Sequence, residues 1–123
     1  MLVAMVLAED NVTIVPIVEG KVIRIYDTQT GESKDFPNPA LGLTEGRRGA
    51  AVAWAKQQGV EVFCTPPGTL CELSYERAQK EKLRFYRLEA GTTFSTLQSL
   101  LENGIVAEVA ALPKNEIEWS GIV

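Results

Sequence analysis

The segment over residues 60–69, VEVFCTPPGT, constrains the fold more than any other part of the chain. A short apolar run ends at a Pro-Pro-Gly turn, and Thr69 then opens the sequence T-L-C-E, which fits the S/T-x-x-E capping box of a helix. The pattern predicts a buried strand at 60–64, a turn, and a helix that begins at Thr69. Strand-to-helix turns at the carboxyl ends of parallel strands are where α/β proteins hold ligands. The segment therefore predicts both a fold class and a place for a site.

Hydrophobic patterning extends this prediction to the rest of the chain. Strands are predicted at 2–7, 12–18, 21–26, 33–36 and 83–88, and Pro16 should place the second of them at an edge or a bulge. Three helices are predicted: one at 47–58, one that begins at Thr69, and one that begins at Phe94 and ends at Asn103-Gly104. The inner face of the second helix should be formed by Leu70, Leu73 and Ala78. Residues 105–112 fit either a strand or a helix.

The resulting order of elements predicts a single α/β domain over residues 1–112 and a tail over 113–123. An antiparallel meander should be joined to parallel strands in one mixed sheet, because parallel strands need a crossover through a helix. Helices then cover both faces of the sheet, which is the ribonuclease-H-like arrangement. The apolar end of the tail could dock on the body of the chain or on a second copy, as a homodimer.

Composition excludes several classes of function. The net charge is −4 and no Lys/Arg cluster occurs, so neither nucleic acid nor an anionic membrane is an expected partner. The chain contains no histidine, which excludes a His base or a His-ligated metal within it. The first predicted strand carries no acid for a two-metal nuclease. We identify no catalytic residue, and two cysteines without an export signal favour a cytoplasmic setting.

Two cysteines, Cys64 and Cys71, flank the Pro-Pro-Gly turn. As thiolates they could bind a soft metal or a metal–sulfur cluster, with Cys64 the stronger candidate because it ends the strand. Two ligands separated by six residues do not complete a zinc site. The alternatives are a short disulfide, or two small buried side chains, which is where free cysteines are commonly found.

Five residues are candidates for binding an anion. A helix that begins at Thr69 would offer free backbone N–H groups and the positive end of its dipole, and Gly68 would let a ligand approach the backbone. Thr65 lies in the same turn. Arg47 and Arg48 open the preceding helix, where positive charge is unfavourable with the dipole, so the pair indicates an anionic partner. The alternative is that both arginines are solvated loop residues.

Several stretches together resemble the dinitrogenase iron–molybdenum cofactor-binding family. They are VIRIYDTQTGE at 22–32, PNPA at 37–40, the glycine-led helix at 46–55, GVEVF at 59–63, GTT at 91–93 and ENG at 102–104. The likeness covers residues 1–104. The chain departs from the family at 15–20, where a His-Phe-Gly element is common, at 64–68, which replaces a Gly-rich loop, and at Lys82, where glycine is common.

The resemblance implies a ribonuclease-H-like fold and a small non-enzymatic carrier. Its ligand would be a molybdenum- or iron-containing cluster, or another small anion, over residues 64–69 with Arg47 and Arg48 nearby. A metal-free interaction or regulatory module of the same fold is the alternative.

Overall fold

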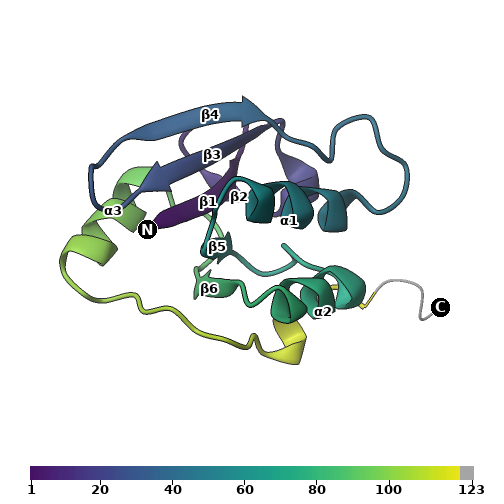
Figure 1. The fold of residues 1–123 in the computed structure, drawn as a ribbon. Coiled ribbons are helices and arrows are strands. Elements are labelled where there is room, and N and C mark those ends of the chain that lie inside the picture. Colours follow the sequence, from purple (N-terminus) through teal and green to yellow (C-terminus); the bar gives the residue numbers. More distant parts are fainter. Residues whose placement is uncertain (120–123) are drawn as a thin grey trace.

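A computed structural model describes residues 1–119 as a mixed sheet with helices on both faces (Figure 1). The sheet has six strands, and five of them lie side by side in the order β4-β3-β1-β5-β6, with β2 paired to β1. Their bounds are β1 (Leu2–Leu7), β2 (Ile14–Val15), β3 (Val22–Asp27), β4 (Ser33–Pro37), β5 (Val62–Thr65) and β6 (Arg84–Arg87). The predicted mixed α/β architecture is confirmed.

The central strand β1 owes its place to its composition. An uninterrupted apolar run suits a strand that is covered on both faces, and residues 3–7 are all buried. β3 pairs antiparallel with β1 along its whole length, from Leu2 opposite Asp27 to Leu7 opposite Val22. β2 and the parallel strand β5 therefore share the other edge of β1. β6 extends the parallel part, and β4 extends the meander.

The helices divide between the two faces of the sheet. α1 (Arg47–Gln57) and α2 (Glu72–Lys80) lie together on one face, where their buried alanines pack against alternate strand residues. α3 (Phe94–Glu102) covers the other face through Leu97. Two apolar clusters result, one on each side, because successive side chains of a strand point to opposite faces.

The predicted start of α2 at Thr69 is wrong. The hydroxyl of Thr69 is buried and donates a hydrogen bond of 2.6 Å to the carbonyl of Pro66, so it cannot cap a helix. α2 begins three residues later, and Cys71 is its N-cap. The backbone N–H of Cys71 donates to Ser74 Oγ over 2.9 Å, while the Cys71 side chain accepts from the Ser74 N–H. A cysteine and a serine thus make the reciprocal bonds of a capping box.

Three other segments differ from the predictions. Only Ile14–Val15 of the predicted strand at 12–18 pairs, since Pro16 has no N–H and leads into the 3-10 turn η1 (Ile17–Glu19). Residues 105–112 form neither strand nor helix, and their backbone pairs with the sheet at the single bridge from Val109 to Phe85. Leu73 is not on the inner face of α2, because a helix that begins at Glu72 turns Ser74 and Ala78 inward instead.

Residues 112–119, the C-terminal strap, pack across the β5–α2 turn of their own chain and include the 3-10 turn η2 (Lys114–Glu116) (Figure 1). The Gly68 N–H donates to the Glu116 carbonyl, and the Glu118 N–H donates to the Leu70 carbonyl, both over 2.9 Å. Ile117 is buried. Residues 120–123 of the predicted tail lie outside the described residues, and homodimerisation through the tail stays a prediction.

No helix within residues 1–119 combines the length and the apolar character that a membrane crossing requires.

Candidate functional site

The turn that the sequence predicts as the site is closed by the chain itself. Thr65 and Thr69 are buried, and their hydroxyls donate to the carbonyls of Tyr86 and Pro66. Gly68 has a φ of +88°, and a Cβ placed there would lie 3.2 Å from Glu118 Oε1 of the strap. The strap therefore lies over the backbone that a ligand was expected to approach.

The two cysteines lie on opposite sides of the sheet. Cys64 is enclosed in the apolar cluster on the α3 side, and burial raises the pKa of its thiol. Cys71 is partly exposed beside α1 and α2, and both cysteines are free. Within residues 1–119, no three His, Cys, Asp or Glu side chains gather closely enough to hold a metal ion. The structure does not bring the two thiols together.

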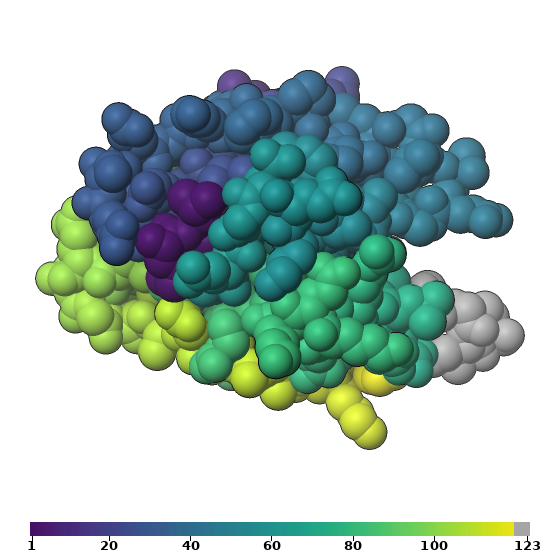
Figure 2. Space-filling model, in the orientation of Figure 1, coloured from purple at the N-terminus to yellow at the C-terminus, as the bar shows by residue number. Residues whose placement is uncertain are grey.

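Arg47 and Arg48 do come together with Cys71, in a groove between the start of α1 and the first turns of α2. The groove measures about 730 Å³. Figure 2 shows the surface hollowed between the blue loop that leads into α1 and the green surface of α2. We call it the arginine groove; it is lined by Thr44, Glu45, Gly46, Arg47, Arg48, Gly49, Ala50, Cys71, Leu73, Ser74 and Arg77.

The charge of the arginine groove is opposite in sign to that of the whole chain. Three arginines line it against one carboxylate, that of Glu45, although the net charge of the protein is −4. The third arginine, Arg77, pairs with Glu81 at 3.7 Å on the exposed side of α2. The groove is therefore the place where the described chain concentrates positive charge around a hollow.

The start of α1 is an open helix end. Its N-cap is Gly46, at a φ of +64° that favours glycine, and no side chain caps it. Among residues 1–119, no group accepts a hydrogen bond from the backbone N–H of Arg47, Arg48 or Gly49. The first turn of α1 also contains no acid. Free N–H groups at a helix start form a site for an anion.

The start of α2, by contrast, is closed. The Glu72 N–H donates to the Glu118 carbonyl of the strap over 3.2 Å, and the Cys71 side chain accepts from the Ser74 N–H. The structure therefore does not have the helix start with free N–H groups that the sequence predicts at Thr69, whereas the start of α1 does have such groups.

Cys71 and Arg48 interact electrostatically in the groove. Burial opposes ionisation of the Cys71 thiol, but hydrogen bonds from Ser74 and the positive charge of Arg48 outweigh it, so the pKa of the thiol is lowered. Ser74 Oγ lies 3.2 Å from Cys71 Sγ. Arg48 Nε is buried and has no hydrogen-bond partner within residues 1–119. A buried donor without a partner calls for an acceptor from outside the chain.

Sequence reasoning missed Arg77 and Ser74 as groove residues. Both lie on α2 within two turns of Cys71, and the spacing of three residues from Cys71 to Ser74 and from Ser74 to Arg77 places them along one side of the helix. This spacing is a signal that the sequence contains.

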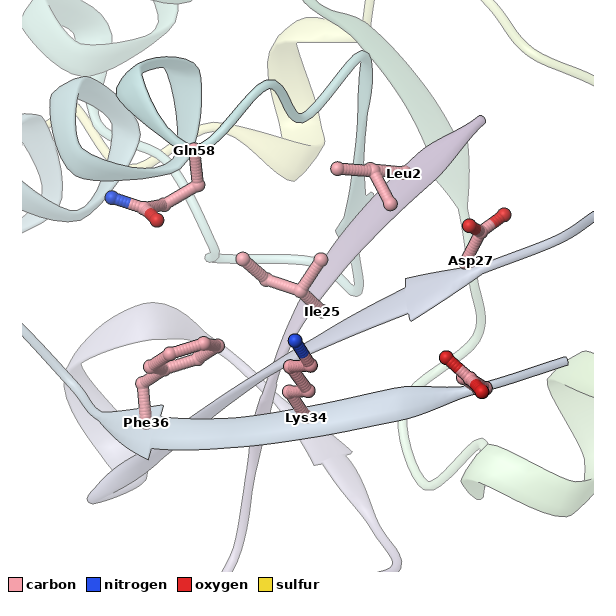
Figure 3. Close-up of a pocket in the computed structure, with 7 residues that line it drawn as sticks. Leu2, Ile25, Asp27, Lys34, Phe36 and Gln58 are labelled. Carbon is pink, nitrogen blue, oxygen red and sulfur yellow. The ribbon is translucent and has the colours of Figure 1, made fainter. Parts of the chain in front are cut away.

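A second pocket lies at the other end of α1, between the start of β1 and strands β3 and β4 (Figure 3). It measures about 240 Å³, and its floor is formed by Leu2, Ile25 and Phe36. Its polar lining is Asp27, Glu32, Lys34 and Gln58, so that one lysine faces two carboxylates. The pocket is smaller than the arginine groove and contains none of the predicted site residues.

The fold defines a class, that of small α/β proteins in which four strands paired antiparallel are joined to two parallel strands in a single six-stranded sheet. Within this class the structure is similar to the apo form of the orange protein from Desulfovibrio gigas, with a TM-score of 0.74 over 92% of this chain and 96% of that chain at 17% identity. It is also similar to a putative NifB protein from Thermotoga of the DUF35 family, with a TM-score of 0.63 over 92% and 97% of the two chains at 19% identity.

The sequence matches no model of a known protein family and no curated protein. At these identities the two likenesses show a shared fold. The ribonuclease-H-like assignment stays a prediction.

Proposed function

We propose that this chain is a small binding or carrier protein, without catalytic activity of its own, that holds an anionic ligand in the arginine groove. The observation that carries the proposal is the open start of α1. The backbone N–H groups there have no hydrogen-bond partner within residues 1–119, and the side chains of Arg47 and Arg48 lie beside them. The Nε atom of Arg48 is buried and also lacks a partner within this range. An anion would accept these hydrogen bonds and offset the charge of two arginines that are unfavourable at a helix start.

The class of ligand that we favour is an anionic metal cluster or another small anion, carried as cargo in the cytoplasm. Two likenesses support it: the sequence resembles the dinitrogenase iron–molybdenum cofactor-binding family, and one structural neighbour is described as a putative NifB protein. The residues present fit an anion held by charge and N–H donors. They do not supply the three or four ligands of a metal ion, since Cys71 is the sole thiol in the groove. The protein would therefore hold its cargo by charge and by hydrogen bonds to peripheral atoms of the cargo, and not by coordinating the metal.

Calorimetric titration under anaerobic conditions, with sodium tetrathiomolybdate and separately with inorganic phosphate, tests the proposal. We expect saturable binding of at least one of them, and Arg48→Gln should weaken it roughly tenfold, since hydrogen bonds to charged groups are worth about 1.5–3 kcal/mol. Arg84→Gln removes an exposed arginine outside the groove and should retain the wild-type affinity. No saturable binding of either anion or of an organic phosphate, or equal losses in both variants, would contradict the proposal.

A metal-free interaction module is the second candidate, because large apolar side chains are exposed beside the groove. They are Leu41, Leu43 and Leu73, and Trp119 of the strap is also partly exposed. Sedimentation equilibrium of the wild type and of Trp119→Ala tests self-association through the strap. If both variants are monomers at high concentration, a homodimer through the tail is excluded.

A further inference from the structure

We propose that the arginine groove selects an organic anion, in which a charged head is joined to an apolar body, over a bare inorganic oxyanion. This inference rests on the proposed function, because it takes for granted that an anion binds beside Arg47 and Arg48. Its own support comes from the size of the groove and from two of its residues, Gly49 and Leu73.

The groove is too large for an oxyanion alone. It measures about 730 Å³ and falls in the range of roughly 300–1,000 Å³ that is typical of sites for organic ligands. An oxyanion of four oxygens takes the place of only a few water molecules, each of about 30 Å³. Arg47, Arg48 and the open start of α1 account for one part of the groove, and the wall formed by α2 remains for the rest of a ligand.

Leu73 supplies an apolar side chain on α2, the helix that faces Arg47 and Arg48 in the groove. It is the second residue of α2 and lines the groove, yet 76% of its surface is exposed. Most other residues of α2 that face solvent are charged or polar. An apolar ligand body that covered Leu73 would remove apolar surface of both partners from water. The adjoining hollow, which shares Arg47 with the groove, has two further exposed leucines in its lining, Leu41 and Leu43.

Gly49 leaves the backbone of α1 open to the groove. Its φ is not in the left-handed region, and a Cβ at this position would meet no atom within 4 Å. The fold therefore does not require glycine here, and glycine is less favourable than alanine inside a helix. Because glycine has no Cβ, a ligand in the groove could approach the backbone closely at Gly49, which agrees with the geometry.

Calorimetric titration with inorganic phosphate and 1-naphthyl phosphate tests the inference. The two probes share a phosphate head, and the second adds an apolar body. We expect 1-naphthyl phosphate to bind roughly tenfold more tightly than phosphate to the wild type, since burial of an apolar body adds to the affinity. Leu73→Ser should lower the ratio of the two affinities severalfold, and Gly49→Ala should lower it while raising the Tm of the free protein.

The control is Ile105→Ser, which removes an equally exposed apolar side chain outside the groove and should retain the wild-type ratio. Equal affinities of the two probes for the wild type would overturn this inference while leaving the proposed function intact. A ratio that stays the same in both Leu73→Ser and Gly49→Ala would overturn it as well. If neither tetrathiomolybdate nor either phosphate binds, the proposed function fails, and this inference fails with it.

Discussion

Cys64 and Cys71 show how position sets the chemistry of a residue. Burial raises the pKa of the Cys64 thiol, whereas hydrogen bonds from Ser74 and the charge of Arg48 lower that of Cys71 against the opposing effect of burial. The thiolate is the reactive form of cysteine. We therefore expect iodoacetamide to modify Cys71 in the folded protein at neutral pH and Cys64 only after unfolding. Peptide mapping by mass spectrometry measures both, and equal labelling of the folded protein would contradict the assignment.

Ser74→Ala tests the cause of the lowered pKa. The Ser74 hydroxyl stabilises the charged form of Cys71, so its removal should raise the pKa of the thiol and move the curve of alkylation rate against pH to higher pH. The same substitution removes one bond of the N-cap and should cost about 1 kcal/mol of stability. Ser95→Ala, at an exposed position of α3, is the matched control. A curve that does not move would assign the lowered pKa to Arg48 and to the backbone N–H groups of Leu73 and Ser74 instead.

At the scale of the element, the start of α1 is less stable than a helix of this sequence could be. Arg47 and Arg48 stand where a negative charge is favoured, and no side chain caps the helix. We expect Arg47→Glu to stabilise the free protein by about 0.3–1 kcal/mol and at the same time to abolish binding of the anionic probes. Thermal denaturation and calorimetry measure the two effects.

Lys21→Glu makes the same change of charge at an exposed position outside the groove and should leave anion binding near the wild-type value. If Arg47→Glu destabilised the protein, the dipole argument for the start of α1 would be wrong. If it retained anion binding, the arginine groove would not be the site.

The C-terminal strap is held by both backbone and side-chain contacts. It bonds to Gly68, Leu70 and Glu72 through backbone groups, and Glu116 pairs with Arg87. Ile117 is 6% exposed within it, whereas Ile105 in the neighbouring segment is 70% exposed. Ile117→Ala should therefore lower the free energy of unfolding by about 2–4 kcal/mol, and Ile105→Ala by less than about 0.5 kcal/mol. Urea denaturation measures both, and similar small losses would show that the strap does not stabilise the fold.

At the scale of the whole molecule, the elements of the fold could be predicted because each depends on its own sequence. The apolar run of β1 and the alternation of β3 predict a covered strand and a half-covered one, as observed. Lys82 stands where glycine is common in the family that the sequence resembles, and it has a φ of +61° in the turn after α2, a conformation that favours glycine.

The candidate site could be predicted only in part, because it depends on contacts between segments far apart in the sequence. Arg47 and Arg48 were identified from their clash with the helix dipole, which is a local property. The strap, some 50 residues later in the chain, covers Gly68 and closes the turn that contains Thr69. Cys64 and Cys71 lie on opposite sides of the sheet because Cys64 points from β5 toward the α3 side, whereas the turn leads the chain to α2 on the other face. No pattern within residues 60–71 contains this information.

Amide hydrogen exchange distinguishes the two positions for a ligand across the whole molecule. In the free protein, the N–H groups of Arg47, Arg48 and Gly49 should exchange rapidly, since no group within residues 1–119 accepts their hydrogen bonds, while those of β1 should exchange most slowly. We expect saturating 1-naphthyl phosphate to slow exchange at 47–49, because the bound anion accepts these bonds, and to change β3 and β4 little. NMR resolves the individual amides. Slowed exchange at 65–69 instead would place the ligand at the strand-to-helix turn and contradict the arginine groove.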